Sequence, residues 1–285
     1  MKNDRLKTLP EIMHNCRVKT YPNGTQEVLF SRDAVFRETG WQLADKWQAD
    51  AKVSGTATDK AASLDRAKRR ARNAVRDIAL SNEFSYFVTF TLDASKVDRY
   101  DINAVVKKMN YWLDNRVRRN GLKYVLVPEL HKDGAVHFHG FVNDCLGLVD
   151  SGTLTGGELK RPRKPRSIRE RDSLLASGCH VVYNVTDWKL GFSTAIELYG
   201  EYRSAVGYVC KYISKAQEKI GGRWYYSGGQ LDKPSVSLTD IDFDAFLSDN
   251  NDEAQLFKSG GLEFGIMTLG GVSRWSRKRT MPTMP

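Results

Sequence analysis

The sequence contains few cysteines, and they suggest no cysteine-based scaffold. Among 285 residues there are four, at Cys16, Cys145, Cys179 and Cys210. They lie far apart and form no CxxC pair, which argues against both a disulfide framework and a thiolate zinc site. We therefore expect the cysteines to be reduced.

Long apolar segments are also missing. No stretch approaches the roughly 18 to 20 consecutive apolar residues that a membrane-spanning helix needs. The first residues, MKNDRLKTLPEIMHN, carry charges where a signal peptide would have its apolar segment. We expect a cytoplasmic protein with no membrane partner. The phosphate-binding pattern GxxxxGK[ST] is absent as well, so the sequence gives no sign of an ATP-driven motor.

Negative charge is outnumbered by positive charge. Asp and Glu together number 34 against 44 Lys and Arg, which leaves a formal net charge of +10 at pH 7. Such a chain attracts polyanions, and nucleic acid is the most common of these. Hydrophobic residues make up 41% of the sequence, enough for a folded core, so wholesale disorder is not expected.

The middle of the chain has the pattern of an α+β domain. Alternating apolar and β-branched residues predict three strands, at 85–93 (SYFVTFTLD), 122–131 and 135–144. Between the first two, apolar residues at helical spacing predict a helix at 102–119, with Asp101 as N-cap and Gly121 closing it. The order strand, helix, hairpin favours an antiparallel sheet of about five strands, with helices on one face.

Further elements extend this domain over residues 81–228. We predict a fourth strand at HVVYNVTDW (180–188), a helix from about Ala195 to Lys219 and a short strand at RWYYSGG. Residues from about 150 to 178 read as an exposed loop insertion, because glycine, serine and proline interrupt them. Residues 1–80 read as a basic, helical accessory region and residues 229–285 as a C-terminal accessory region. We expect no helicase domain.

Two basic segments are candidates for contact with nucleic-acid phosphates. One is a predicted helix at 65–77 and the other is the insertion; their candidate residues are Arg66, Lys68, Arg69, Arg70, Arg72, Arg163, Lys164 and Arg166. A run of this kind can also be an ordinary solvated helix face. The excess positive charge of the whole chain favours phosphate contact.

The segment PELHKDGAVHFHG suggests a metal site on a β-hairpin. Asp133-Gly134 favours a three-residue loop that pairs His131 with Ala135. In that register Glu129 faces His137, and His139 lies on the same side of the sheet. Two imidazoles and a carboxylate suit Mn²⁺ or Mg²⁺ and, less well, Zn²⁺.

This reading of the hairpin has alternatives. The HxH pattern alone is more often the polar side of a half-buried strand. A two-residue turn would place Glu129 on the opposite face of the sheet. His131 shares the predicted face and can be a ligand, a supporting group or a surface residue.

The segment AVGYVCKYISKAQE suggests a nucleophile on a helix. Tyr208, Lys211, Tyr212 and Lys215 are spaced to lie on one stripe. Aromatic residues at this spacing usually belong to a core, but lysines are hard to bury, so the stripe more plausibly borders a cleft that holds anions. A tyrosine hydroxyl near lysines and a metal-bound phosphate can attack phosphorus.

These segments together resemble the HUH endonuclease superfamily. HFHG is similar to its metal motif, YVCKY to its catalytic tyrosine helix and FVTFTLD to its first motif, and they occur in family order. The resemblance is to rolling-circle replication initiators (Rep) of small single-stranded DNA phages and plasmids, of the two-tyrosine type. It implies a ferredoxin- or RRM-like antiparallel sheet with a central metal hairpin and flanking helices.

The resemblance also implies roles for single residues. His137, His139 and Glu129 match the metal ligands, Tyr208 and Tyr212 the paired nucleophiles, and Lys211 and Lys215 the accompanying lysines. Both Tyr208-Lys211 and Tyr212-Lys215 also satisfy the YxxK pattern of single-tyrosine members, so one or two nucleophiles remain open.

The implied activity is metal-dependent nicking of single-stranded DNA at a replication origin in a bacterial host cytoplasm. A tyrosine takes the 5′ phosphate, the strands are later rejoined, and a host helicase and polymerase act as partners. Alternatives are a mobilisation relaxase or transposase of the same superfamily, and a non-catalytic DNA-binding regulator.

Overall fold

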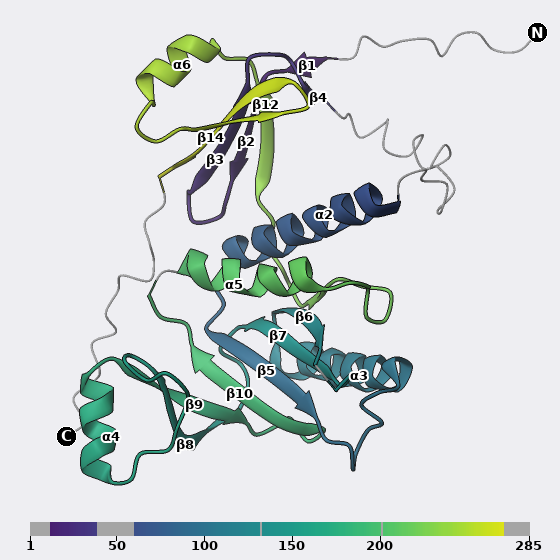
Figure 1. Cartoon of the computed structure of the whole chain (residues 1–285), viewed down its shortest axis with the longest axis vertical. Helices are drawn as coiled ribbons and strands as arrows, with labels where there is room; N and C mark the ends of the chain where they lie inside the picture. The colour runs from purple at the N-terminus through teal and green to yellow at the C-terminus, as the bar shows by residue number, and fades with distance from the viewer. Residues whose placement is uncertain (1–11, 39–59, 132, 201, 271–285) are drawn as a thin grey trace, which may run out of the picture. The chain divides into compact units, whose positions relative to one another are not determined.

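The computed structural model describes residues 12–38, 60–131, 133–200 and 202–270 (Figure 1). The chain divides into two compact units. We call Ala61–Asp232 the central unit, and Met1–Lys60 together with Lys233–Pro285 the terminal unit. No helix in the described parts of the chain is long and apolar enough to cross a membrane.

The central unit is built on a seven-stranded antiparallel sheet. Its strand order is β11-β6-β7-β5-β10-β9-β8. The strands are β5 (Tyr86–Leu92), β6 (Tyr124–Leu130), β7 (Val136–Val142), β8 (Leu148–Gly156), β9 (Cys179–Val185), β10 (Gly191–Glu197) and β11 (Tyr226–Gly228). The predicted α+β class and antiparallel pairing are confirmed, and the sheet is larger than the predicted five strands.

Four helices accompany this sheet: α2 (Lys60–Ser81), α3 (Ile102–Asn120), α4 (Ile168–Ala176) and α5 (Tyr202–Lys215). The predicted caps of α3 are confirmed. The Asp101 side chain accepts hydrogen bonds from the first backbone N–H groups, and Gly121 ends the helix in the left-handed conformation with φ 67°. The helix therefore starts and stops where the local chemistry of the sequence requires.

Helices cover both faces of the sheet, which corrects the expectation of helices on one face. Val88, Phe90 and the other even-numbered residues of β5 pack in one core with α3. On the opposite face, Val125, Val127 and Phe141 pack with α2 and α5. Both sides of these strands are apolar at one end, so each side buries its residues beneath a helix.

The expected loop insertion is instead largely regular structure. The sequence LVDSGTLTG forms β8, which pairs antiparallel with β9. Pro162 and Pro165 precede α4, whose N-cap is Ser167, so they lie before the helix and do not interrupt it. Backbone hydrogen bonds between Leu154 and Arg163 tie the intervening segment to β8.

The predicted helix from Ala195 to Lys219 is wrong at both ends. Residues Gly191–Glu197 form β10, which pairs along its length with β5. Gly200 then adopts φ 66°, a left-handed conformation that glycine tolerates, and α5 begins at Tyr202. The β-branched and aromatic residues of GFSTAIE favour a strand, and the partner strand β5 decides the outcome.

The terminal unit combines the two regions that the sequence suggested were separate accessories. Its five-stranded antiparallel sheet has the order β12-β2-β3-β14-β13. Its elements are β1 (Met13–His14), β2 (Cys16–Thr20), β3 (Gln26–Ser31), β4 (Phe36–Arg37), β12 (Ser235–Thr239), α6 (Phe243–Asp249), β13 (Gln255–Ser259) and β14 (Leu262–Leu269). Val28, Phe30 and Met267 are buried in its core, packed with Phe243 of α6.

The prediction of a helical first region is therefore wrong for residues 12–38. The turn at Pro22-Asn23-Gly24 joins β2 and β3 into a hairpin, with Gly24 at φ 83°. The predicted helix at 65–77 does form, as part of α2, but it packs in the central unit. The segment 39–59 and the basic tail from residue 271 lie outside the described residues.

Candidate catalytic site of the central unit

The β6–β7 hairpin has the register that the sequence predicts. The backbone N–H of His131 donates to the Ala135 carbonyl (2.8 Å), and Gly134 adopts φ 87° in the three-residue loop. Glu129 is the direct partner of His137, and Val127 is the partner of His139. The carboxylate and both imidazoles therefore point to the same face of the sheet.

Glu129 and His139 are in contact. Oε2 of Glu129 lies 3.1 Å from Nε2 of His139, whose side chain is only 12% exposed. The contact lacks the alignment of a hydrogen bond, so this buried nitrogen has no hydrogen-bond partner. The opposite ring nitrogen, Nδ1, is hydrogen-bonded with Oγ1 of Thr89 (3.1 Å). The ring is thus held from behind, with a free nitrogen facing a carboxylate.

The imidazole of His139 is neutral near pH 7. Burial, with a smaller contribution from His137, lowers its pKa to about 4. The neighbouring carboxylate of Glu129 does not outweigh this desolvation, so the 3.1 Å contact is not an ion pair. A neutral nitrogen beside a carboxylate is a pair of donors for a cation.

His137 stands beside this pair rather than in contact with it. Its ring centroid lies 6.3 Å from that of His139 and 5.1 Å from that of His131, on which it stacks. Oγ1 of Thr91 lies 3.4 Å from its Nδ1. Burial lowers the pKa of His137 also. His131 itself is exposed and pairs with Asp133, as a surface residue near the turn would.

These donors fit a divalent cation, although the ligand set is not fully assembled. The unpartnered Nε2 of His139 and the adjacent carboxylate of Glu129 are the donors that such an ion needs. Among the described residues, no group of three or more His, Cys, Asp or Glu side chains has the spacing of a metal site. His137, one ring away, is the residue that would complete the set.

Helix α5 places two tyrosines over the hairpin. Val206, Val209 and Ile213 bury the side of α5 that packs on the sheet. The ring of Tyr212 stacks on that of His139, with centroids 4.4 Å apart and planes 2° apart. The Tyr212 hydroxyl donates to the Tyr208 hydroxyl at 2.8 Å. The predicted stripe is therefore real, and one of its members touches a predicted metal ligand.

The two tyrosines differ in environment. Tyr208 is 50% exposed and its ring meets Phe87 edge-on. Tyr212 is half-buried, and burial, followed by its hydrogen bond to Tyr208, raises its pKa above the ordinary value. Lys211 and Lys215 are exposed on the same helix. The tyrosine that accepts the hydrogen bond is thus the one that solvent reaches more easily.

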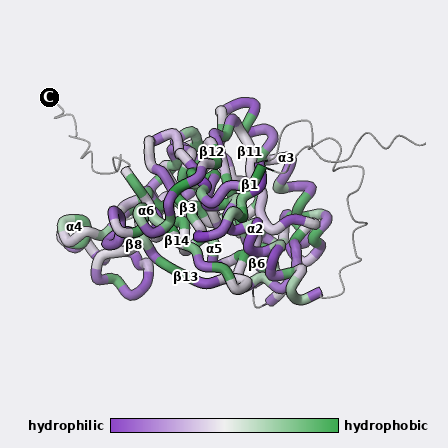
Figure 2. The backbone as a smooth tube through the Cα atoms, turned by 90° about the horizontal axis from the view of Figure 1, so that it is seen from above, coloured by the Kyte–Doolittle hydropathy of each residue, from purple (hydrophilic) through white to green (hydrophobic). Residues whose placement is uncertain are grey.

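The predicted DNA-binding residues of α2 lie on a strongly hydrophilic helix (Figure 2). Arg66, Arg69 and Arg70 are exposed. Lys68 and Arg72 are partly covered: Nζ of Lys68 lies 5.9 Å from the centroid of the Trp224 ring, and Nη1 of Arg72 donates to the Ser214 hydroxyl (3.0 Å).

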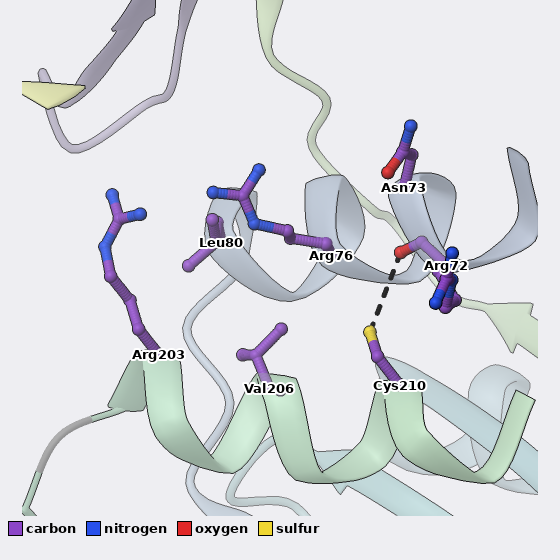
Figure 3. Close-up of a pocket in the computed structure, with 8 residues that line it drawn as sticks. Arg72, Asn73, Arg76, Leu80, Arg203, Val206 and Cys210 are labelled. Atoms are coloured by element: carbon purple, nitrogen blue, oxygen red, sulfur yellow. Dashed lines mark hydrogen bonds between the residues drawn. The ribbon is translucent and has the colours of Figure 1, made fainter. Parts of the chain in front are cut away.

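A groove of about 160 Å³ separates α2 from α5. Figure 3 shows guanidinium groups from both helices along it, from Arg72 and Arg76 on α2 and from Arg203 on α5. The Cys210 thiol closes one end by donating to the Arg72 carbonyl oxygen (3.7 Å). The side of α5 that faces away from the tyrosines is therefore also basic.

The insertion uses part of its positive charge internally. Arg163 pairs with Glu170 (2.7 Å), and Arg171 pairs with Asp150. Lys164 and Arg166 are exposed. Of the three insertion residues predicted to bind DNA, these two are the ones whose side chains remain directed to solvent.

Sequence reasoning missed the two threonines that support the histidines. Thr89 is the β-sheet partner of His139, and Thr91 is the partner of His137. The signal was present, because Thr89 and Thr91 alternate with apolar residues in FVTFTL just as the histidines alternate in HFHG. Recognising it required knowing that β5 lies next to β7.

The comparison with protein families agrees with this site. The model of the Replication-associated protein ORF2 family, a family of rolling-circle replication initiators, matches residues 85–217, slightly less than half of the chain. The matched segment contains the hairpin, both tyrosines and the insertion. The match supports a role in DNA replication, with DNA as the partner. Neither the curated proteins nor the solved structures include a match to the chain.

Proposed function

We propose that the central unit is a metal-dependent, site-specific single-stranded DNA endonuclease and strand transferase that initiates rolling-circle replication. The observation that carries the proposal is the stacking of Tyr212 on His139, at 4.4 Å. This contact brings the tyrosines of α5 to the donors of the β6–β7 hairpin. A nucleophile for phosphorus and a place to hold a phosphate then lie together.

Glu129, His139 and His137 are the residues that would hold Mn²⁺ or Mg²⁺, which would polarise the scissile phosphate. Thr89 and Thr91 fix the two imidazole rings from behind. This support keeps the rings oriented toward the cleft without the need for a charged partner.

Tyr208 is the first nucleophile in this proposal. Its oxygen forms a bond to phosphorus, the bond from phosphorus to the 3′ oxygen breaks, the phenolic proton leaves to solvent and the 3′ oxygen takes up a proton. The hydrogen bond from Tyr212 at 2.8 Å stabilises the negative charge that builds on the Tyr208 oxygen during attack. The product is a 5′-phosphotyrosine and a free 3′ hydroxyl.

Tyr212 serves the second cleavage. It lies one helical turn from Tyr208 and shares its hydrogen bond, so it can reach the same phosphate while Tyr208 still carries DNA. Because the phosphotyrosine bond retains the energy of the phosphodiester, a 3′ hydroxyl can displace the tyrosine and rejoin the strands without ATP. Strand separation and synthesis would come from a host helicase and polymerase.

Positive charge around the site would hold the DNA strand. Lys211 and Lys215 lie on the tyrosine helix, while the α2 residues and the insertion add further cations. Their contacts with phosphates give affinity rather than sequence recognition.

The test is the formation of a covalent adduct. The purified chain is incubated with a randomised pool of single-stranded oligonucleotides and Mn²⁺, and SDS-resistant protein–DNA adducts are isolated and sequenced. We expect adducts that contain one preferred sequence and disappear in excess EDTA. His139→Ala should form none, whereas His180→Ala, on β9, is the matched control and should behave like the unaltered chain.

The outcomes separate the competing functions. DNA binding with no adduct under any metal condition would favour a non-catalytic regulator and refute the proposal. If adducts form, the recovered sequence is located on the replicon that encodes the chain. A nick at its replication origin supports an initiator, and a nick at a transfer origin or a mobile-element end supports a relaxase or transposase.

A further inference from the structure

A row of four side chains crosses the sheet at the candidate site. Glu129 on β6 pairs with His137 on β7, His137 pairs with Thr91 on β5, and Thr91 pairs with Phe192 on β10. Directly opposed residues of antiparallel strands project to the same face. Phe192 therefore stands on the face that carries the predicted metal ligands.

Phe192 is 72% exposed, although it is a large apolar residue on a strand of the main sheet. Other parts of this face behave differently. Phe87 and Phe141 lie on the same face, in a row that is covered, and pack with the helices of the second core. At the row of Phe192, the described residues place no helix over the sheet in this way. An aromatic ring is left open to solvent beside the site.

The surroundings of Phe192 are polar. The neighbouring residues on this face are Thr91 on the adjacent strand and Thr194 two positions along β10. A single ring among threonines is too small for a protein-docking surface, which requires a contiguous apolar patch. It has the size and character of a platform for one flat, partly apolar group. Two strand spacings, roughly 10 Å, separate its backbone from that of His137.

We propose that Phe192 is a stacking platform for one nucleobase of the DNA strand, next to the scissile phosphate. This inference rests on the proposed function and deepens it by assigning a contact to the base rather than to the backbone. Aromatic side chains bind single-stranded DNA in this way, and the contact tolerates every base because each has a π-face. Stacking on Phe192 would position the phosphate at Tyr208 while leaving sequence recognition to other residues.

The first experiment measures binding without cleavage. Oligothymidylate binding is followed by fluorescence anisotropy in EDTA, so that the result does not depend on nicking. We expect Phe192→Ala to weaken binding roughly 5- to 150-fold, the effect of losing one stacked base. Phe192→Tyr should bind like the unaltered chain because it keeps the ring. The matched control is Tyr111→Ala, which removes an equally exposed ring (71%) from α3, on the other side of the sheet.

Salt dependence distinguishes stacking from an indirect effect on charge. Phe192 carries no charge, so Phe192→Ala should lower the affinity at every salt concentration without changing the slope of log K against log salt. A changed slope would show that phosphate contacts were disturbed and would overturn the assignment. Unaltered affinity in Phe192→Ala would overturn it also.

Photocrosslinking locates the contact directly. An oligonucleotide carrying 5-iododeoxyuridine is irradiated in the complex, and the crosslinked peptide is sequenced. We expect a crosslink at Phe192, lost in Phe192→Ala. A sedimentation experiment adds one more outcome: if Phe192→Ala dissociates a dimer of the chain, the ring serves contact between copies and the platform is refuted. Loss of affinity in Phe192→Ala together with no covalent adduct in the unaltered chain would refute the proposed function while the platform stands.

Discussion

Replacing the two tyrosines of α5 by phenylalanine separates their chemical role from their structural one. The hydroxyls of Tyr208 and Tyr212 share one hydrogen bond of 2.8 Å, and either substitution removes it. Such a bond contributes about 0.5–1.5 kcal/mol, which for a unit of this size corresponds to a fall in Tm of roughly 1–6 °C. The ring at position 212 can still stack on His139, so all variants should fold.

The effect on cleavage should be larger than the effect on stability. In Tyr212→Phe, Tyr208 loses the donor that stabilises its developing charge; a hydrogen bond to a charged group contributes about 1.5–3 kcal/mol, so cleavage should slow by roughly 10- to 150-fold. In Tyr208→Phe the remaining nucleophile is Tyr212, whose pKa is raised by burial, and we expect slower cleavage still. The double variant should form no adduct.

The assay is single-turnover adduct formation on end-labelled DNA containing the preferred sequence, read on a denaturing gel, with Tm measured for each variant. Peptide mapping of adducts from the unaltered chain should find DNA on both tyrosines. Tyr111→Phe is the control for loss of an exposed hydroxyl elsewhere and should cleave normally.

Two results would refute this reasoning. An adduct in the double variant would place the nucleophile on another residue. Complete loss of cleavage in one single variant, with the other acting like the unaltered chain through strand transfer, would show a single catalytic tyrosine. In that case the second ring packs the helix against His139.

Three further predictions concern the metal and the charges. Cleavage should stop in excess EDTA and return with Mn²⁺ or Mg²⁺, and folded His137→Ala or His139→Ala should not cleave at any metal concentration; normal nicking by either would remove the metal assignment. Glu129→Ala should raise the metal concentration needed for half-maximal cleavage, and an unchanged requirement would mean that the carboxylate is not a ligand. Replacing Arg69 and Arg70 by glutamine should weaken binding to all sequences and lower the log–log salt slope by about 0.7 to 0.9 per lost contact, whereas an unchanged slope would make them solvated surface.

The parts of the site that the sequence predicted are those fixed by local geometry. The Asp133-Gly134 loop determines the register of its hairpin, so the pairing of Glu129 with His137 follows from counting residues. In the same way, the helical repeat places Tyr208 and Tyr212 one turn apart. Neither inference needs knowledge of the rest of the fold.

The parts that the sequence did not predict depend on partners distant in the chain. LVDSGTLTG looks like a loop until β9 lies beside it, and GFSTAIE reads as the start of a helix until β5 provides its hydrogen bonds. The exposed ring of Phe192 gained meaning only when β10 was found beside Thr91. Local periodicity cannot report such neighbours, because pairing energy comes from the second strand.

The terminal unit has a consequence for the order in which the chain is made. Its hairpin β2–β3 is synthesised first, but the partners of that hairpin, β12 and β14, come from beyond Lys233. Until those strands leave the ribosome, Val28 and Phe30 lack their covering from Phe243 and Met267. The central unit, contiguous between Ala61 and Asp232, has no such wait. The end of translation therefore falls to the assembly of the outermost residues of the sequence, and the segment with the candidate catalytic site can be folded before the flanking sheet closes.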